Sequence, residues 1–152
     1  MSCEKDWVDI MTALLTPTIA ILGSAIAILQ WRTNRLRLKH ELFDKRYDVY
    51  TSAMAFIVSV VQYNQIKELD RIAFLAGTKG AKFLFPKKIN DYLDMIHTKA
   101  CDLQCSIDEL GGTLSDAKRA ENIKTRHDII KWFVAQLGML ADEIQPFIEL
   151  KH

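Results

Sequence analysis

An uninterrupted apolar stretch near the N-terminus, from Ile10 to Trp31, is the strongest feature of the hydrophobic pattern. It reads IMTALLTPTIAILGSAIAILQW, 22 residues without a charged side chain. Because a helix rises about 1.5 Å per residue, this stretch spans roughly 33 Å, close to the bilayer hydrocarbon thickness of about 30 Å. The pattern therefore predicts a transmembrane helix at residues 10–31, preceded by a short extracytoplasmic N-terminus at residues 1–9.

Residues 32–152 alternate charged and apolar positions at helical spacing. The first helix is expected to leave the membrane unbroken and to continue to about Ala76, where the sequence GTKG ends it. Two further amphipathic helices are expected, one from Pro86 to the glycines at 111–112 and one from about Leu114 to Ile144, with Pro146 breaking or kinking the latter. The predicted fold class is all-α, an N-terminal transmembrane helix continuing into a cytoplasmic antiparallel helical bundle.

In each helix the apolar positions recur on one face, which is expected to form the core of the bundle. On the first helix this face holds Leu36, Phe43, Tyr47, Tyr50, Met54, Ile57, Val58 and Val61, extended by Ile66, Leu69 and Ile72. On the second it holds Ile89, Tyr92, Leu93, Ile96, Ala100, Leu103 and Ile107. On the last it holds Ile123, Ile130, Phe133, Val134, Leu137, Leu140 and Ile144.

The charges on either side of the apolar stretch predict its orientation. Three of the four charged side chains before it are acidic, and it is followed by a run of basic residues with no acid among them, Arg32, Arg35, Arg37 and Lys39. The side richer in Lys and Arg faces the cytoplasm, which places the N-terminus outside. The acidic N-terminus and the length of the stretch disfavour a cleaved signal peptide, while a buried helix of a soluble protein stays an alternative.

Small and bulky side chains lie on different faces of the predicted transmembrane helix. The bulky face holds Leu15, Ile19, Leu22, Ile26 and Leu29. The small-residue face holds Thr16, Ala20, Gly23, Ala27 and Gln30. Small residues let membrane helices approach closely, so this face is expected to contact other copies of the chain. Two interpretations stay open: a plain self-associating anchor, or a homo-oligomer whose small-residue face lines a narrow pore.

A second candidate site consists of four basic residues on one broad helical face, Arg32, Arg35, Lys39 and Arg46. In a ring of chains they would bind the phosphates of a polyanion, whereas the alternative is binding to lipid headgroups. The net charge of the whole chain is only +1, so bulk charge does not indicate a nucleic-acid partner. The basic residues between 118 and 127 are interleaved with acids, which favours a solvated face.

His97, Cys101 and Cys105 recur every fourth residue of one predicted helix. The first and the last are about 12 Å apart along it, too far for one tetrahedral zinc with bonds of about 2.0–2.3 Å. We therefore expect no metal and interpret the three as two packed thiols and a half-buried imidazole. The sequence also holds no glycine-rich phosphate loop and no nucleophile elbow, so neither an enzyme nor a cofactor is expected.

Three segments carry a resemblance to known proteins, LFDKRYDVY at 42–50, AKFLFPKKINDYLDMIHTKA at 81–100 and WFVAQLGMLADEIQPFIEL at 132–150. Together with QWRTNR at 30–35, they resemble a widespread group of small bacterial single-pass membrane proteins, and most specifically the membrane effectors of the Hailong anti-phage system. The resemblance covers nearly the whole chain. It implies a homo-oligomer in the bacterial inner membrane that is opened by short DNA oligomers made by a nucleotidyltransferase partner.

These observations lead to two functional hypotheses. The first is a homo-oligomeric effector that forms a gated pore or ion channel, opened by a cytoplasmic ligand such as a short oligonucleotide, in anti-phage defence. The second is a non-conducting membrane anchor that binds a partner protein. The expected partners are other copies of the chain, membrane lipids and, by the resemblance, the nucleotidyltransferase and its oligonucleotide product.

Overall fold

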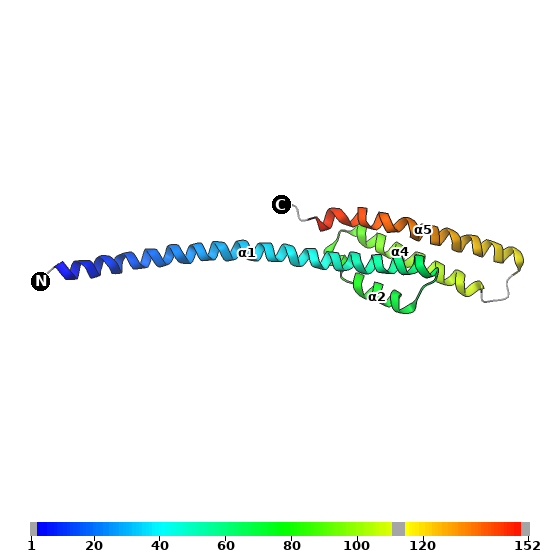
Figure 1. Cartoon of the computed structure of the whole chain (residues 1–152), viewed down its shortest axis with the longest axis horizontal. Helices are drawn as coiled ribbons and strands as arrows, with labels where there is room; N and C mark the ends of the chain where they lie inside the picture. Colours follow the sequence, from blue (N-terminus) through cyan, green and yellow to red (C-terminus); the bar gives the residue numbers. More distant parts are fainter. Residues whose placement is uncertain (1–2, 111–114, 150–152) are drawn as a thin grey trace. The chain divides into compact units, whose positions relative to one another are not determined.

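In this computed structural model the chain is described over residues 3–110 and 115–149, without the side chains of residues 3–6, 8–10 and 16. The described residues form helices and no strand, which confirms the predicted all-α class (Figure 1). The helices are α1 (Cys3–Tyr63), α2 (Glu68–Thr78), α3 (Ala81–Leu84), α4 (Lys87–Leu110) and α5 (Asp116–Ile148). The chain divides into two compact units, residues 1–41 and residues 42–152, and α1 contributes to both.

The first unit is a single helical segment whose described side chains from Met11 to Glu41 are all exposed. It belongs to the one helix, among the described residues, that is long and apolar enough to cross a membrane. Three of its hydroxyl groups are bonded within the helix: Thr18 donates to the carbonyl oxygen of Leu14, Ser24 to that of Ala20 at 2.8 Å, and Thr33 to that of Leu29 at 2.9 Å. Internally satisfied polar groups are what a bilayer requires of a helix that crosses it.

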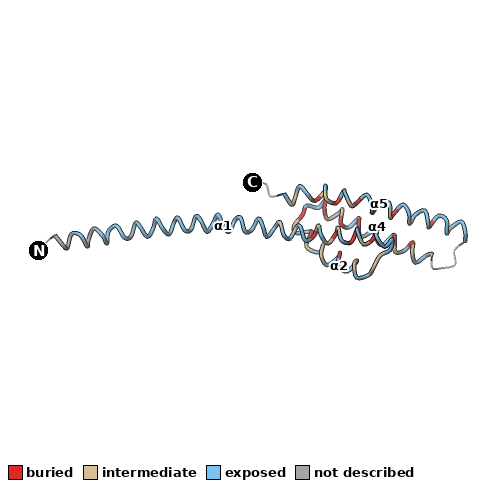
Figure 2. Tube along the Cα trace, viewed as in Figure 1, coloured by how far each residue is buried: buried red, intermediate tan, exposed pale blue. Residues whose placement is uncertain are grey.

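The second unit is the bundle, in which α1 beyond residue 41, α2, α4 and α5 alternate in direction (Figure 1). The buried positions lie along the inner sides of these helices (Figure 2). The largest fully buried side chains are Phe56, Phe74, Phe133, Ile57, Ile89, Ile96, Leu103, Leu140, Ile144 and Val60. One buried amide is also satisfied inside: Gln136 accepts from the Tyr92 hydroxyl at 2.6 Å and donates to the Trp132 carbonyl at 3.1 Å. The predicted antiparallel helical bundle is thus present in the second unit.

The predicted core face is right for α4 and partly wrong for α1 and α5. Every residue of α4 that was assigned to the core is buried or half-buried. In α5, Ile123 and Val134 are exposed, and in α1 Tyr47 and Val58 are exposed as well. Ile57 is buried as predicted, and the other buried residues of α1 are Val49, Ala53, Phe56 and Val60, which were not predicted. The reason is that α1 and α5 carry apolar residues on several faces, so periodicity alone does not select the inner one.

Helix α1 ends at Tyr63, so the prediction that it continues to about Ala76 is wrong. Asn64 adopts a left-handed backbone conformation with φ of 52°, which Asn tolerates better than most residues with a side chain. Its amide donates to the carbonyl of Val60 at 2.9 Å, and its own carbonyl accepts from Arg126 of α5 at 2.7 Å. The prediction weighed Gly and Pro as helix breakers and gave Asn64 no weight.

A helix does end within the sequence GTKG, as predicted, because α2 ends at Thr78, and Gly77 lies in its last turn. A Cβ at this position would lie only 2.2 Å from the Oγ and 2.4 Å from the Cβ of Ser52 on α1. The absence of a side chain therefore permits close contact between the two helices. The other face of α2 is open, because Leu69 and Ile72, both assigned to the core, are 80% and 52% exposed.

The two prolines of the bundle lie at helix ends. Pro86 directly precedes α4, close to its predicted place in the first turn, and its carbonyl accepts from the amide of Ile89 at 3.0 Å. Pro146 lies in the last turn of α5, which runs on to Ile148, so the predicted break at Pro146 is wrong. A proline this close to a C-terminus removes one helical hydrogen bond without ending the helix. Thr113, whose spacing from Asp116 resembles a capping box, lies outside the described residues.

Candidate functional site

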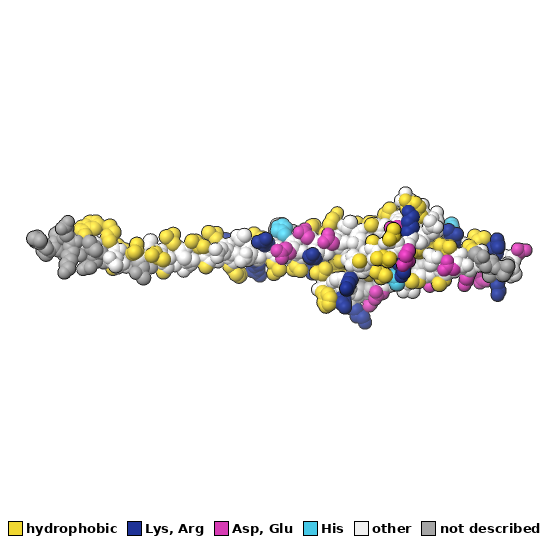
Figure 3. All heavy atoms as spheres, turned by 90° about the horizontal axis from the view of Figure 1, so that it is seen from below, with side chains coloured by type: hydrophobic (Ala, Val, Ile, Leu, Met, Phe, Trp, Pro, Cys, Tyr) yellow, Lys and Arg dark blue, Asp and Glu magenta, His cyan; other side chains and the backbone are white. Residues whose placement is uncertain are grey.

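The small-residue face of α1 is exposed in the first unit. Ala20, Gly23, Ala27 and Gln30 are all exposed, and a Cβ at Gly23 would meet no atom within 4 Å. The side chain of Thr16 lies outside the described side chains. Apolar side chains are equally uncovered along this unit (Figure 3). Both faces of the helix are therefore available to lipid or to another chain.

The basic residues predicted to act together fall into different units. Arg32, Arg35 and Lys39 lie in the first unit and are exposed. The guanidinium of Arg35 lies over the Trp31 ring, 5.4 Å from its centroid, a cation–π contact at the predicted exit from the membrane. For these three residues both interpretations stay open, binding to the phosphates of a polyanion and binding to lipid headgroups.

Arg46 lies in the second unit and binds within the bundle. Its Nε donates to the carbonyl of Leu84 at 3.0 Å and its Nη1 to the carbonyl of Phe147 at 2.6 Å. The guanidinium also lies 5.8 Å from the ring centroid of Phe85. It thus satisfies orphan carbonyls at the C-terminal ends of α3 and α5 while it holds both to α1. This contact accounts for Arg46 without a lipid or a polyanion.

An apolar groove of about 440 Å³ lies between α1 and the C-terminal part of α5. We call it the aromatic groove, and its lining is Phe43, Tyr47, Tyr50, Ala141, Gln145, Ile148 and Glu149. The rings of Phe43 and Tyr47 are stacked with centroids 5.9 Å apart, and Tyr50 follows at 5.8 Å from Tyr47. The sequence analysis placed these aromatic residues in the core, whereas Tyr47 is half-exposed on the wall of a groove.

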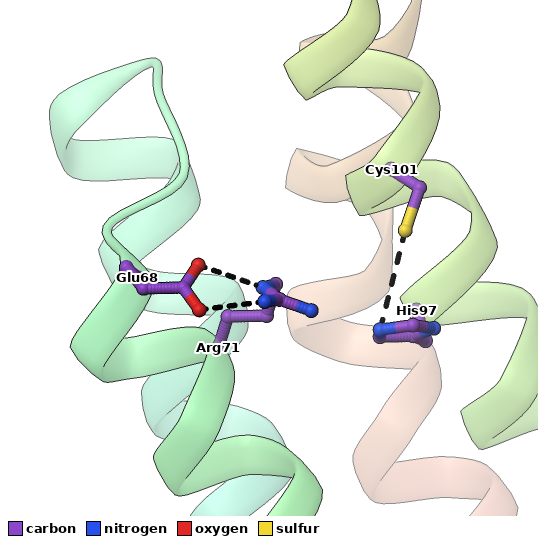
Figure 4. A network of polar contacts seen from close by, with 4 residues as sticks. All are labelled: Glu68, Arg71, His97 and Cys101. Carbon is purple, nitrogen blue, oxygen red and sulfur yellow. Dashed lines mark hydrogen bonds and ion pairs between the residues drawn. The ribbon is translucent and has the colours of Figure 1, made fainter.

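Two polar pairs lie on neighbouring helices, one on α2 and one on α4 (Figure 4). Arg71 donates to both carboxylate oxygens of Glu68, at 2.9 and 2.6 Å. The hydrogen bond with Arg71 lowers the pKa of Glu68, and the same bond raises the pKa of Arg71, so the pair stays ionised. On α4 the Sγ of Cys101 lies 4.0 Å from Nε2 of His97. Sequence reasoning considered His97 and Cys101 but missed Glu68 and Arg71, which only the docking of α2 brings near them.

A polar cavity of about 660 Å³ lies between the C-terminal half of α4 and the N-terminal half of α5. Asn122, which is 8% exposed, donates to Glu109 at 2.8 Å, while its Oδ1 has no partner among the described residues. Lys99, paired with Asp102 at 3.6 Å, and Lys118 also line the cavity. Charges of both signs face one another there, so the lining favours no single class of ligand.

Metal binding was not expected, and the described residues contain no group of three or more His, Cys, Asp or Glu side chains placed to hold a metal ion. The thiols of Cys101 and Cys105 are exposed rather than packed, so that part of the interpretation is wrong, whereas the imidazole of His97 is half-buried as expected. No family model, no curated protein and no solved structure matches this chain.

Proposed function

We propose that this protein is a homo-oligomeric single-pass membrane protein that forms a gated pore, with the small-residue face turned toward the neighbouring copies and the pore axis. The observation that carries the proposal is the first unit itself. Its stretch from residue 10 to residue 31 holds no charged side chain, the described side chains from Met11 onward are exposed, and small and bulky residues lie on different faces. Lipid gives no reason for such a division, whereas contact between helices does.

In this proposal the bundle lies on the cytoplasmic side of a bacterial inner membrane, because the basic residues follow the apolar stretch. No ionisable side chain lies between residues 10 and 31, so a closed pore would exclude ions by dewetting rather than by a charged filter. A cytoplasmic ligand opens the pore by rearranging the bundle, and the resemblance in sequence points to a short oligonucleotide.

Two alanines of α1 provide a matched test of the proposed pore face. Ala27 lies on the small-residue face, whereas Ala25, two residues earlier, lies about 200° around the helix. Both are exposed in the first unit, so Ala27→Leu and Ala25→Leu add the same side chain at nearly the same depth. A steric cost of about 1–3 kcal/mol at a close helix contact weakens association by a factor of about 5 to 140. We expect Ala27→Leu alone to reduce assembly and leakage.

The measurement uses full-length protein reconstituted into liposomes loaded with a self-quenched dye, with and without short DNA oligomers, and mass photometry of the detergent-solubilised protein. Equal leakage by wild type and Ala27→Leu would contradict the pore face. Loss of leakage in both variants would show that α1 responds to any added bulk. A stable wild-type oligomer that never releases dye would favour the anchor.

The aromatic groove favours a second candidate function, a non-conducting anchor that holds a partner protein. Its walls are nearly all apolar and aromatic, and aromatic residues are enriched where proteins bind one another. Tyr47→Ser would weaken the binding of a partner protein in this groove and would leave dye release unchanged. Co-purification of a stoichiometric partner that depends on Tyr47, in membranes that stay sealed, would favour this function over the pore.

A further inference from the structure

Cys101 and Cys105 form an internal comparison within α4. They lie one turn apart on one side of the helix, and both thiols are exposed. Their surroundings differ, because the Sγ of Cys101 lies 4.0 Å from Nε2 of His97, whereas no imidazole contacts Cys105 in the part of the chain that the structure describes. Equal exposure therefore predicts equal reactivity for the two thiols, whereas the imidazole beside Cys101 predicts that Cys101 is the more reactive one.

Packing holds the imidazole of His97 in place. Its ring lies parallel to that of Phe74, with an interplanar angle of 6° and centroids 6.4 Å apart. Phe74 is buried and stacks in turn on Phe56 at 4.7 Å. One face of the imidazole is thus fixed by the core, while its Nε2 edge points along α4 toward Cys101 (Figure 4). A base fixed within reach of a thiol is the arrangement that activates a cysteine.

Arg71 adds a fixed positive charge from α2. Glu68 holds its guanidinium with two hydrogen bonds, and Arg71 lies between Glu68 and the His97–Cys101 pair in Figure 4. The hydrogen bond with Glu68 and the charge of that carboxylate raise the pKa of Arg71, so the guanidinium keeps its positive charge. The positive end of the Glu68–Arg71 pair therefore faces α4, and a nearby cation favours a thiolate.

We propose that Cys101 is a site of thiol–disulfide exchange with low-molecular-weight disulfides, with His97 as the proton acceptor. His97 Nε2 takes the proton from Sγ, and the thiolate attacks one sulfur of the disulfide. A new S–S bond forms to Cys101 as the S–S bond of the reagent breaks. The leaving thiolate then takes the proton from the imidazolium, so that a mixed disulfide and one free thiol result. This inference does not depend on pore formation.

The test uses full-length protein in detergent and two variants with one cysteine each. Cys3→Ser/Cys105→Ser retains Cys101, and Cys3→Ser/Cys101→Ser retains Cys105. Reaction with 4,4′-dithiodipyridine at pH 7 is followed by the absorbance of the released thiopyridone, and the adduct formed with oxidised glutathione is weighed by mass spectrometry. We expect Cys101 to react about threefold faster or more than Cys105, because a thiolate reacts and a thiol does not.

His97→Phe is the decisive further change, because it keeps an aromatic ring on Phe74 and removes Nε2. In this background we expect the rate of Cys101 to fall to that of Cys105, while the rate of Cys105 stays the same. If circular dichroism shows that His97→Phe unfolds the bundle, His97→Gln replaces it with the same expectation. Equal rates for the two thiols, or a rate of Cys101 that does not change when Nε2 is removed, would overturn the proposal.

Discussion

Leu22 in the first unit and Phe133 in the second are both large apolar residues of long helices, yet Leu22 is 59% exposed and Phe133 is fully buried. Phe133 belongs to a cluster of buried residues drawn from several helices of the second unit, whereas Leu22 lies on a single helical segment whose described side chains from Met11 to Glu41 are all exposed. The stability of the bundle is therefore encoded within the chain. The first unit depends on its surroundings, because about 25 cal/mol per Å² of apolar surface favours its transfer from water.

Truncation of these two side chains tests the comparison with the largest expected effect. Phe133→Ala leaves a cavity in a packed core and is expected to lower the free energy of unfolding of the bundle by about 3–5 kcal/mol. Leu22→Ala is expected to leave it unchanged. The measurement is urea unfolding in mild detergent, followed by Trp132 fluorescence in a Trp7→Phe/Trp31→Phe background. A large effect of Leu22→Ala on this transition would show that the units are not independent.

Two glycines sharpen the comparison within the second unit. Gly77→Ala places a Cβ against Ser52. Such overpacking lowers the free energy of unfolding by about 1–3 kcal/mol, and the higher helix propensity of Ala offsets about 1 kcal/mol of this loss. Gly138→Ala on α5 meets no atom within 4 Å and is expected to stabilise the bundle by up to about 1 kcal/mol. The two thermal midpoints should therefore move in opposite directions. A stabilised Gly77→Ala variant would contradict the close contact of α2 with α1.

The smallest predicted effect comes from Tyr92. Burial of its hydroxyl, with the nearby charge of Glu143, raises the pKa of Tyr92 to about 12. The folded state therefore holds the proton more tightly than the unfolded chain, and the resulting stability is present below pH 10 and is lost as the pH rises through 12. The full difference of about 2.7 kcal/mol is reduced by solvent at this half-buried group to about 1 kcal/mol.

Urea unfolding of wild type and Tyr92→Phe at pH 9, 10 and 11 measures this contribution. The stability of the wild type should decline over this range, and that of Tyr92→Phe should decline less. At pH 9 the variant should itself be less stable, because the carbonyl oxygen of the buried Gln136 loses its donor. Parallel pH profiles for the two proteins would contradict the assignment to Tyr92.

The sequence by itself determined the all-α class, the apolar stretch at residues 10–31 and the core face of α4. In each case one local pattern is sufficient: a charge-free run longer than a bilayer, or apolar residues confined to one side of a helix. The small-residue face was likewise predicted from spacing, and its role stays a prediction, because the described side chains of both faces are exposed.

Only the tertiary structure decided where α1 ends, which face of it is buried and what Arg46 and Arg71 contact. Helix α1 ends before Asn64, which has a left-handed conformation and whose carbonyl accepts a hydrogen bond from Arg126, far away in sequence. In the sequence Arg46 cannot be told apart from the other basic residues of its face. In the structure it donates to carbonyls at the ends of α3 and α5. Such partners are brought together by the packing of helices, and a pattern that reaches only a few residues along one helix contains no information about them.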